Sequence, residues 1–176
     1  MPGKLWENTR ELHHACEAHP VGAAMASGKP SMNWYAGWLE TLRVIHSTLD
    51  NHMPKSAHRV NELEQDLKAC GFFVSSPVAA TKYAESLKTQ DELDGAAYVL
   101  TGAHLMGGEI MRRRLEGYPT NHLIWEDRKE TLTYLLSLRD REELTQTSIN
   151  CFQALLDSMD EIQDYDNTFD ISNRDW

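Results

Sequence analysis

Apolar residues recur at three- and four-residue intervals along most of the chain, which is the spacing of one face of an α-helix. The pattern is clearest over residues 32–52, where a broad stripe contains Trp34, Tyr35, Trp38, Leu39, Leu42, Ile45 and Leu49. Ser31 precedes this stretch and is a suitable N-cap. Residues 4–18 show the same spacing and end at His19-Pro20, because the residue before a proline avoids the helical region.

Glycines and prolines divide the rest of the chain into further helical pieces. We expect a short helix or turn over 21–30, and helices over about 56–69, from Ser76-Pro77 onward, over 89–115, 122–138 and 142–163. The sequence therefore predicts an all-α, single-domain bundle of about seven helices spanning residues 1–163. The acidic segment 164–176 is expected to be loose unless Phe169, Ile171 or Trp176 docks.

The charge balance limits the classes of function. The chain has 27 acidic and 17 basic residues, a net charge of -10, which disfavours binding to nucleic acid. It contains neither an apolar run of about 20 residues nor a start that resembles a secretory signal, so we expect a cytoplasmic protein that does not enter membranes. Three cysteines lie far apart without a CxxC pair, which favours reduced thiols. A monomer is the default expectation.

Thr9, His13 and Glu17 follow one another at intervals of four residues and therefore share one face of the first predicted helix. A histidine held on a rigid helix is a suitable axial ligand for heme iron, provided that its second ring nitrogen finds a partner. Glu17 is a candidate for that partner. Taken alone, a histidine on a helix is more often an ordinary surface or core residue.

The segment from Tyr98 to Glu109 places Gly102, Gly107 and Gly108 inside an otherwise strong helix. Each glycine costs about 1 kcal/mol relative to alanine in a helix interior. Without a Cβ atom the backbone can approach a flat object such as a porphyrin closely. Tight packing of two helices through small residues is the alternative explanation.

In content and order, the two segments together resemble the heme oxygenase family. That family carries the Thr-x3-His-x3-Glu pattern on its first helix, and a tyrosine followed by a glycine-rich run on its distal helix. Phe152 falls where the family has an aromatic residue facing the heme. The resemblance implies that His13 ligates the iron and that further heme contacts come from Glu17, Tyr98, Gly102, Arg128 and Phe152.

The distal segment departs from the family at one position. The family usually has an aspartate three residues before the Gly-Gly pair, where it organises waters that deliver protons, whereas this chain has His104. By resemblance, His104, Gly107 and Gly108 are the candidate catalytic residues. His104 would anchor the water network in our preferred interpretation. It would otherwise ligate the iron as a second axial histidine, or point away from the heme.

The resemblance implies an enzyme that cleaves heme b, its substrate and cofactor, with O2 to biliverdin (the IX-alpha isomer by family default), CO and Fe2+. No GxGxxG fingerprint is present, so electrons would come from an external donor such as ferredoxin. Because the chain is acidic, such a donor would need a local basic face, for which Arg112-Arg113-Arg114 is a candidate.

Three alternative functions remain open from the sequence. One is a non-enzymatic protein that binds or senses heme, and another is a helical interaction module without a cofactor. The third is a di-iron oxidase on the same fold, which usually requires paired Glu-x-x-His motifs. This chain has a single such motif, Glu11 to His14.

Overall fold

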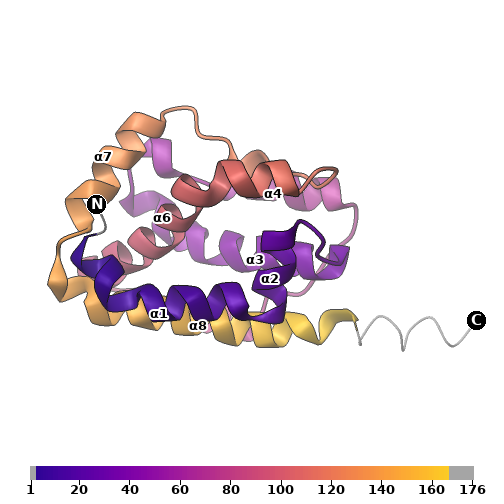
Figure 1. The fold of residues 1–176 in the computed structure, drawn as a ribbon, viewed down its shortest axis with the longest axis horizontal. Helices are drawn as coiled ribbons and strands as arrows, with labels where there is room; N and C mark the ends of the chain where they lie inside the picture. The colour runs from indigo at the N-terminus through magenta and orange to yellow at the C-terminus, as the bar shows by residue number, and fades with distance from the viewer. Residues whose placement is uncertain (1–2, 167–176) are drawn as a thin grey trace, which may run out of the picture.

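The computed structural model describes residues 3–166, and this part of the chain consists of helices and connecting loops without a β-strand (Figure 1). The prediction of an all-α fold is confirmed, with eight α-helices against the expected number of about seven. The α-helices are α1 (Lys4–Ala18), α2 (Pro20–Ser27), α3 (Met32–Leu49), α4 (Val60–Cys70), α5 (Val78–Ser86), α6 (Gln90–Arg114), α7 (Arg128–Leu138) and α8 (Thr145–Gln163). Four short 3-10 helices accompany them: η1 (Asp50–His52), η2 (Lys55–Ala57), η3 (Asn121–Leu123) and η4 (Glu142–Leu144). No helix in this described part is long and apolar enough to cross a bilayer.

Local side-chain signals set several helix ends where the sequence predicted them. The Ser31 hydroxyl accepts a hydrogen bond from the Trp34 backbone N–H at the start of α3. Thr89 begins α6 with a reciprocal capping box to Glu92. Helix α2 ends at Gly28, whose φ of 74° is accessible to glycine without strain.

Two helices begin later than the sequence predicts, because carboxylates fix their starts. Asp50 Oδ2 accepts hydrogen bonds from the backbone N–H groups of Arg59 (3.0 Å) and Val60 (2.9 Å), so α4 begins at Val60 and not near residue 56. Asp127 accepts from the N–H of Glu130 and caps α7, so this helix begins at Arg128 and not near residue 122. The Asp50 contact joins segments nine residues apart, which helical periodicity does not reveal.

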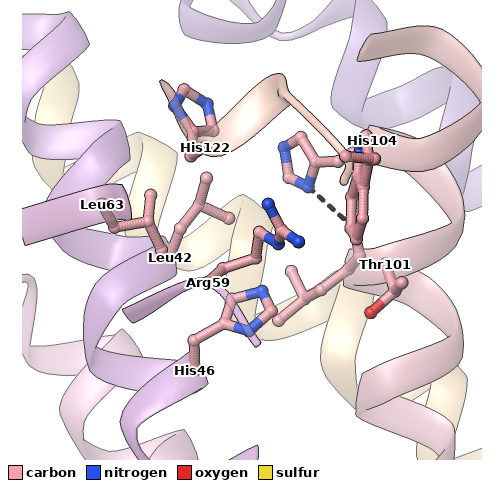
Figure 2. Close-up of a pocket in the computed structure, with 9 residues that line it drawn as sticks. Leu42, His46, Arg59, Leu63, Thr101, His104 and His122 are labelled. Atoms are coloured by element: carbon pink, nitrogen blue, oxygen red, sulfur yellow. Dashed lines mark hydrogen bonds between the residues drawn. The ribbon is translucent and has the colours of Figure 1, made fainter. Parts of the chain in front are cut away.

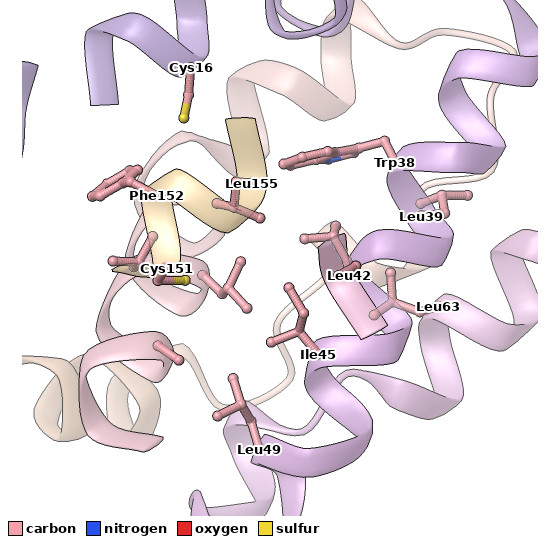
Figure 3. Packing of buried hydrophobic residues seen from close by; sticks show 14 of the residues in the cluster. Cys16, Trp38, Leu39, Leu42, Ile45, Leu49, Leu63, Cys151, Phe152 and Leu155 are labelled. Carbon is pink, nitrogen blue, oxygen red and sulfur yellow. The ribbon is translucent and has the colours of Figure 1, made fainter. Parts of the chain in front are cut away.

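The core lies where α3, α6 and α8 meet, with α1 packed along α8 (Figure 1). The apolar stripe predicted for α3 faces this core, where Trp38, Leu42, Ile45 and Leu49 lie with Leu155 of α8 (Figure 3). All three cysteines are free thiols, and burial raises the pKa of Cys16 and Cys151 to about 12. The low thiolate content of these two thiols agrees with the predicted reduced state.

The described chain continues past the expected domain end at residue 163. The Tyr165 hydroxyl donates a hydrogen bond to the Ser75 backbone carbonyl at 2.6 Å, and its ring lies against Gly37. A Cβ at Gly37 would come within 2.9 Å of that ring, so the close approach requires glycine. Phe169, Ile171 and Trp176, the residues suggested to anchor the acidic segment, lie outside the described residues.

Candidate functional site

His13 lies on α1 with its side chain one quarter exposed, and two aromatic rings hold its imidazole in place. Trp6, on the same helix, meets it edge-on at a centroid distance of 5.0 Å, and Phe152 of α8 does so at 6.2 Å. Its Nδ1 atom is buried and has no hydrogen-bond partner. Glu17 Oε2 lies 3.6 Å from Nδ1, too far for a hydrogen bond but near enough to form one after a small side-chain movement.

Burial lowers the pKa of His13 below its ordinary value of 6.5, against an opposing contribution from the Glu17 carboxylate and a smaller lowering by His14. A lowered pKa keeps the imidazole neutral at physiological pH. A neutral imidazole has one lone pair available for a metal. This side chain is therefore both ordered and chemically competent to ligate iron.

The glycines of α6 have two different roles. At Gly102 and Gly107, an added Cβ would have no heavy atom within 4 Å, so the helix presents bare backbone to open space there. Exposed side chains of Ala103, Met106 and Ile110 extend this surface. Gly108, by contrast, faces inward, and a Cβ there would meet Leu123 at 3.5 Å. The helix-packing alternative does not account for Gly102 and Gly107.

Tyr98 and Arg128 both connect α6 with its neighbours. The half-buried Tyr98 ring packs against the cluster of Leu5, Leu138 and Leu144, and burial raises the pKa of its hydroxyl. The Arg128 guanidinium donates a hydrogen bond to the Leu105 backbone carbonyl, within the glycine-rich part of α6. Arg128 thus places a positive charge beside this segment.

His104 points into the protein and is only 7% exposed. Its ring hydrogen-bonds through Nδ1 to the Leu100 carbonyl at 2.7 Å, and since a carbonyl can only accept, Nδ1 carries the hydrogen. Nε2 is therefore the acceptor when the ring is neutral. Burial lowers the pKa of His104 to about 3, with the neighbouring His122 as a smaller cause. The ring faces α3, α4 and η3, unlike the open glycines.

A buried polar cluster surrounds His104 (Figure 2). His46 of α3 pairs through Nδ1 with Asp50 at 3.1 Å, and His122 pairs through Nδ1 with Asp66 at 2.7 Å. Burial lowers the pKa of His122, although the Asp66 carboxylate opposes this. All three imidazoles are thus hydrogen-bonded through Nδ1, and all three line one small cavity.

That space is a cavity of about 10 Å³, enough for about one water molecule. Arg59 is 6% exposed and lies between the three histidines (Figure 2). It donates to the carbonyls of Ile124 and Ser56, both at 2.8 Å, and its Cζ lies 3.9 Å from the centre of the Trp125 ring. Within the described residues, Arg59 Nε and Trp125 Nε1 have no hydrogen-bond acceptor. The cavity therefore combines unsatisfied donors with imidazole acceptors.

Among the predicted site residues, His13, Glu17 and Phe152 lie together where α1 packs on α8. Gly102, Gly107 and Arg128 lie together on α6 and the adjoining end of α7. Helix α1 packs mainly on α8 and α2, with little direct contact to α6. A groove of about 530 Å³ along α7, lined by Pro54 and Tyr134 among others, contains none of these residues.

Sequence reasoning missed the polar cluster around His104. The spacing of His46 and Asp50, four residues apart on a helix, was a signal for one of its pairs. Asp66 and His122 are 56 residues apart, and no local pattern connects them. No local pattern marks Arg59, which lies within the helix predicted over about residues 56–69.

No protein-family model and no curated protein matches this sequence. Solved structures do share its fold. The heme oxygenase of Leptospira interrogans is 19% identical with a TM-score of 0.73, and the match covers 91% of this chain and 97% of that one. Heme oxygenase-1 of the cyanobacterium Synechocystis, in complex with heme, is 16% identical with a TM-score of 0.74, covering 96% of this chain and 93% of that one. Heme oxygenase-2 of Synechocystis, in complex with heme and NO, is 16% identical with a TM-score of 0.74, and the match covers 96% of this chain and 86% of that one. The chain therefore has a heme oxygenase-like fold.

Proposed function

We propose that the protein is a heme oxygenase, an oxidoreductase that cleaves heme with O2 and external electrons to biliverdin, CO and Fe2+. The observation that carries the proposal is the ordered imidazole of His13, with its unpartnered Nδ1, on the first helix of this fold. Support also comes from the solved structures with the same fold, two of which are heme complexes. Biliverdin IX-alpha is the isomer we expect.

The residues fit a heme. His13 offers a neutral imidazole, and Gly102 and Gly107 offer bare backbone beside the exposed apolar side chains of Ala103, Met106 and Ile110, a surface that a flat ring can lie against. Phe152 provides an apolar edge beside the ligand, and Arg128 provides a charge to pair with a propionate. When bound, the heme supplies the iron that activates dioxygen and the ring that is oxidised.

The chain's own residues would bind the heme, orient it and supply protons. His13 holds the ligand position, and Glu17 moves from 3.6 Å to hydrogen-bond its Nδ1 and fix the tautomer. The bare backbone at Gly102 and Gly107 would give the heme room to lie against α6. We assign His104 the role of holding a proton-relaying water, because its neutral ring is anchored through Nδ1 and lines a cavity with room for one; this cavity lies on the side of α6 turned away from Gly102 and Gly107, so protons would have to pass across the helix to reach the heme.

Electrons come from an external donor, of which ferredoxin is the class we propose. Arg112 and Arg113 lie on the exposed end of α6, where both contact Glu109, at 3.3 and 3.1 Å. The hydrogen bond from Arg112, together with the charges of both arginines and the hydrogen bond from Arg113, lowers the pKa of the Glu109 carboxyl. Two arginines against one glutamate leave a net positive patch for an acidic protein.

The test is turnover of the hemin-loaded protein with ferredoxin, ferredoxin reductase and NADPH in air. We expect the Soret band to decay while a biliverdin band and CO appear together. A Soret band that persists with this donor and with ascorbate would contradict the proposed activity and favour a non-enzymatic heme binder. The absence of any Soret band, combined with iron in the purified protein, would favour a di-iron oxidase.

A further inference from the structure

His13, His14 and Glu17 form a compact group of metal-ligating side chains on α1. Each offers one ligand atom, and these three atoms lie within 4.8 Å of one another. It is the one such group of three among residues 3–166. Two imidazole nitrogens and a carboxylate oxygen make a donor set that suits Zn2+ and Fe2+, with further positions left for water.

The two imidazoles are ordered by a shared neighbour. Trp6 lies edge-on to His13 at 5.0 Å and to His14 at 6.2 Å, and the two histidine rings are 6.0 Å apart. His14 and Glu17 are exposed to solvent, so an ion reaches them without opening the bundle. His13 Nδ1 lacks a hydrogen-bond partner, and Glu17 lies 3.6 Å from it. A metal ion between these groups would satisfy both.

We propose that the heme-free protein binds a divalent transition-metal ion through His13, His14 and Glu17, and that this ion competes with heme for His13. The ion site stands on the α1 geometry alone, whereas the competition rests on the proposed function of His13. A neutral imidazole has a single lone pair for a metal, so a His13 ring that ligates the ion is unavailable to heme iron. His14 takes part in the ion site and has no role in holding heme.

The competition has a consequence for the reaction. The proposed cleavage releases Fe2+ from heme held by His13, which is also one of the three ligands of the proposed ion site. Iron retained there would block the next heme from its ligand. Released Fe2+ would therefore inhibit further heme cleavage, and a chelator would relieve this inhibition.

Calorimetric titration of the heme-free protein with Zn2+, and absorption spectra with Co2+, test the ion site directly. We expect one ion per chain and visible Co2+ bands. His14→Ala should weaken binding at least tenfold while leaving hemin binding unchanged, and His13→Ala should weaken both. Glu11→Gln, an exposed carboxylate on the same helix outside the group, is the matched control and should leave ion binding unchanged.

The outcomes separate this proposal from the proposed function. If hemin binds but Zn2+ does not, or if His14→Ala binds Zn2+ as tightly as the unmodified chain, the ion site is wrong and the heme proposal stands. If Zn2+ binds through His14 but hemin fails to bind, the ion site stands and the heme proposal fails. With both bound, excess Zn2+ should raise the apparent Kd for hemin in the unmodified chain but not in His14→Ala. An unchanged Kd in the unmodified chain overturns the competition.

Discussion

His122 donates two hydrogen bonds to the buried carboxylate of Asp66, from its backbone N–H at 2.9 Å and from its ring Nδ1 at 2.7 Å. The backbone and side chain of Asn121 donate two more, at 2.9 and 2.8 Å. Asp66 is fully buried on α4, whereas its donors lie on η3, between α6 and α7. One carboxylate therefore ties the segment that flanks His104 to α4.

Removing this carboxylate should destabilise the fold strongly. Asp66→Ala leaves four donors without their acceptor, and each buried donor left unsatisfied costs about 1–3 kcal/mol. The free energy of unfolding from urea titration at pH 7 measures this cost. Glu64→Ala, an exposed carboxylate on the same helix, is the control and should change it by less than about 0.5 kcal/mol. Equal effects of the two changes would contradict the role assigned to Asp66.

Stability should fall at mildly acidic pH because of His104. Its pKa is about 3 in the folded protein and near the ordinary 6.5 in the unfolded chain, so below pH 6.5 the unfolded chain binds the extra proton. Stability from this group is complete above pH 6.5 and is lost as the pH falls toward 3. The slope is about 1.4 kcal/mol per pH unit for one histidine.

Two variants test whether His104 causes this pH dependence of the unfolding free energy. His104→Leu should reduce the pH dependence of the unfolding free energy between pH 6 and pH 4 by about 1 kcal/mol per pH unit. The exposed His52, changed to Gln, is the control and should leave the slope unaltered. His122, whose pKa is also lowered, accounts for part of the slope that remains in His104→Leu. A slope insensitive to His104→Leu would contradict its burial as a neutral imidazole.

Two glycines of α6 should respond to alanine in opposite directions. At Gly95, a Cβ would lie 2.1 Å from Thr147 Oγ1 and 3.0 Å from the Ser148 backbone nitrogen, so α6 and α8 would have to separate. Overpacking of this kind costs about 1–3 kcal/mol. At Gly107, the same change meets no atom and should stabilise the heme-free protein by about 0.5–1 kcal/mol. Thermal unfolding of both variants measures the contrast, and destabilisation by Gly107→Ala would contradict the open face of α6.

A substitution at Gly107 also tests whether heme binds on the open face of α6. If a flat substrate lies on this backbone, Gly107→Leu should weaken hemin binding at least tenfold, because the side chain would occupy the substrate's place. Gly71→Leu is a poor control, since its φ of 81° favours glycine. Met106→Leu, at an exposed position one residue earlier, preserves volume and should bind hemin as the unmodified chain does. Unchanged hemin binding in Gly107→Leu would place the substrate elsewhere.

Helical periodicity and capping predict most of this fold. The limits of α1 match the expectation, Ser31 caps α3 as predicted, and α6 begins beside residue 89 as expected, with Thr89 as its cap. The starts of α4 and α7 were misplaced because they depend on carboxylates. Asp50 fixes the first from nine residues away, and Asp127 acts where periodicity suggested that the helix had already begun.

The candidate site shows the same contrast between local signals and long-range contacts. His13 and the glycines could be proposed as site residues from the sequence because the residues of each motif are close in sequence and share a helix. The cluster around His104 could not, because His46, Arg59 and His122 converge from α3, the start of α4 and η3 through contacts that leave no periodic pattern. Nor does sequence spacing indicate that Gly108 faces inward while Gly107 is open. Such orientation depends on how α6 is rotated against its neighbours.

The most direct test of the central claim is a hemin titration of the unmodified chain and of His13→Ala, followed by absorption spectroscopy with and without added imidazole. The account predicts a saturable Soret band at one hemin per chain, a weakened or shifted band in His13→Ala, and its restoration by imidazole, which replaces the missing ligand. The same spectrum from both proteins, unchanged by imidazole, would show that His13 is not the iron ligand and would contradict the account.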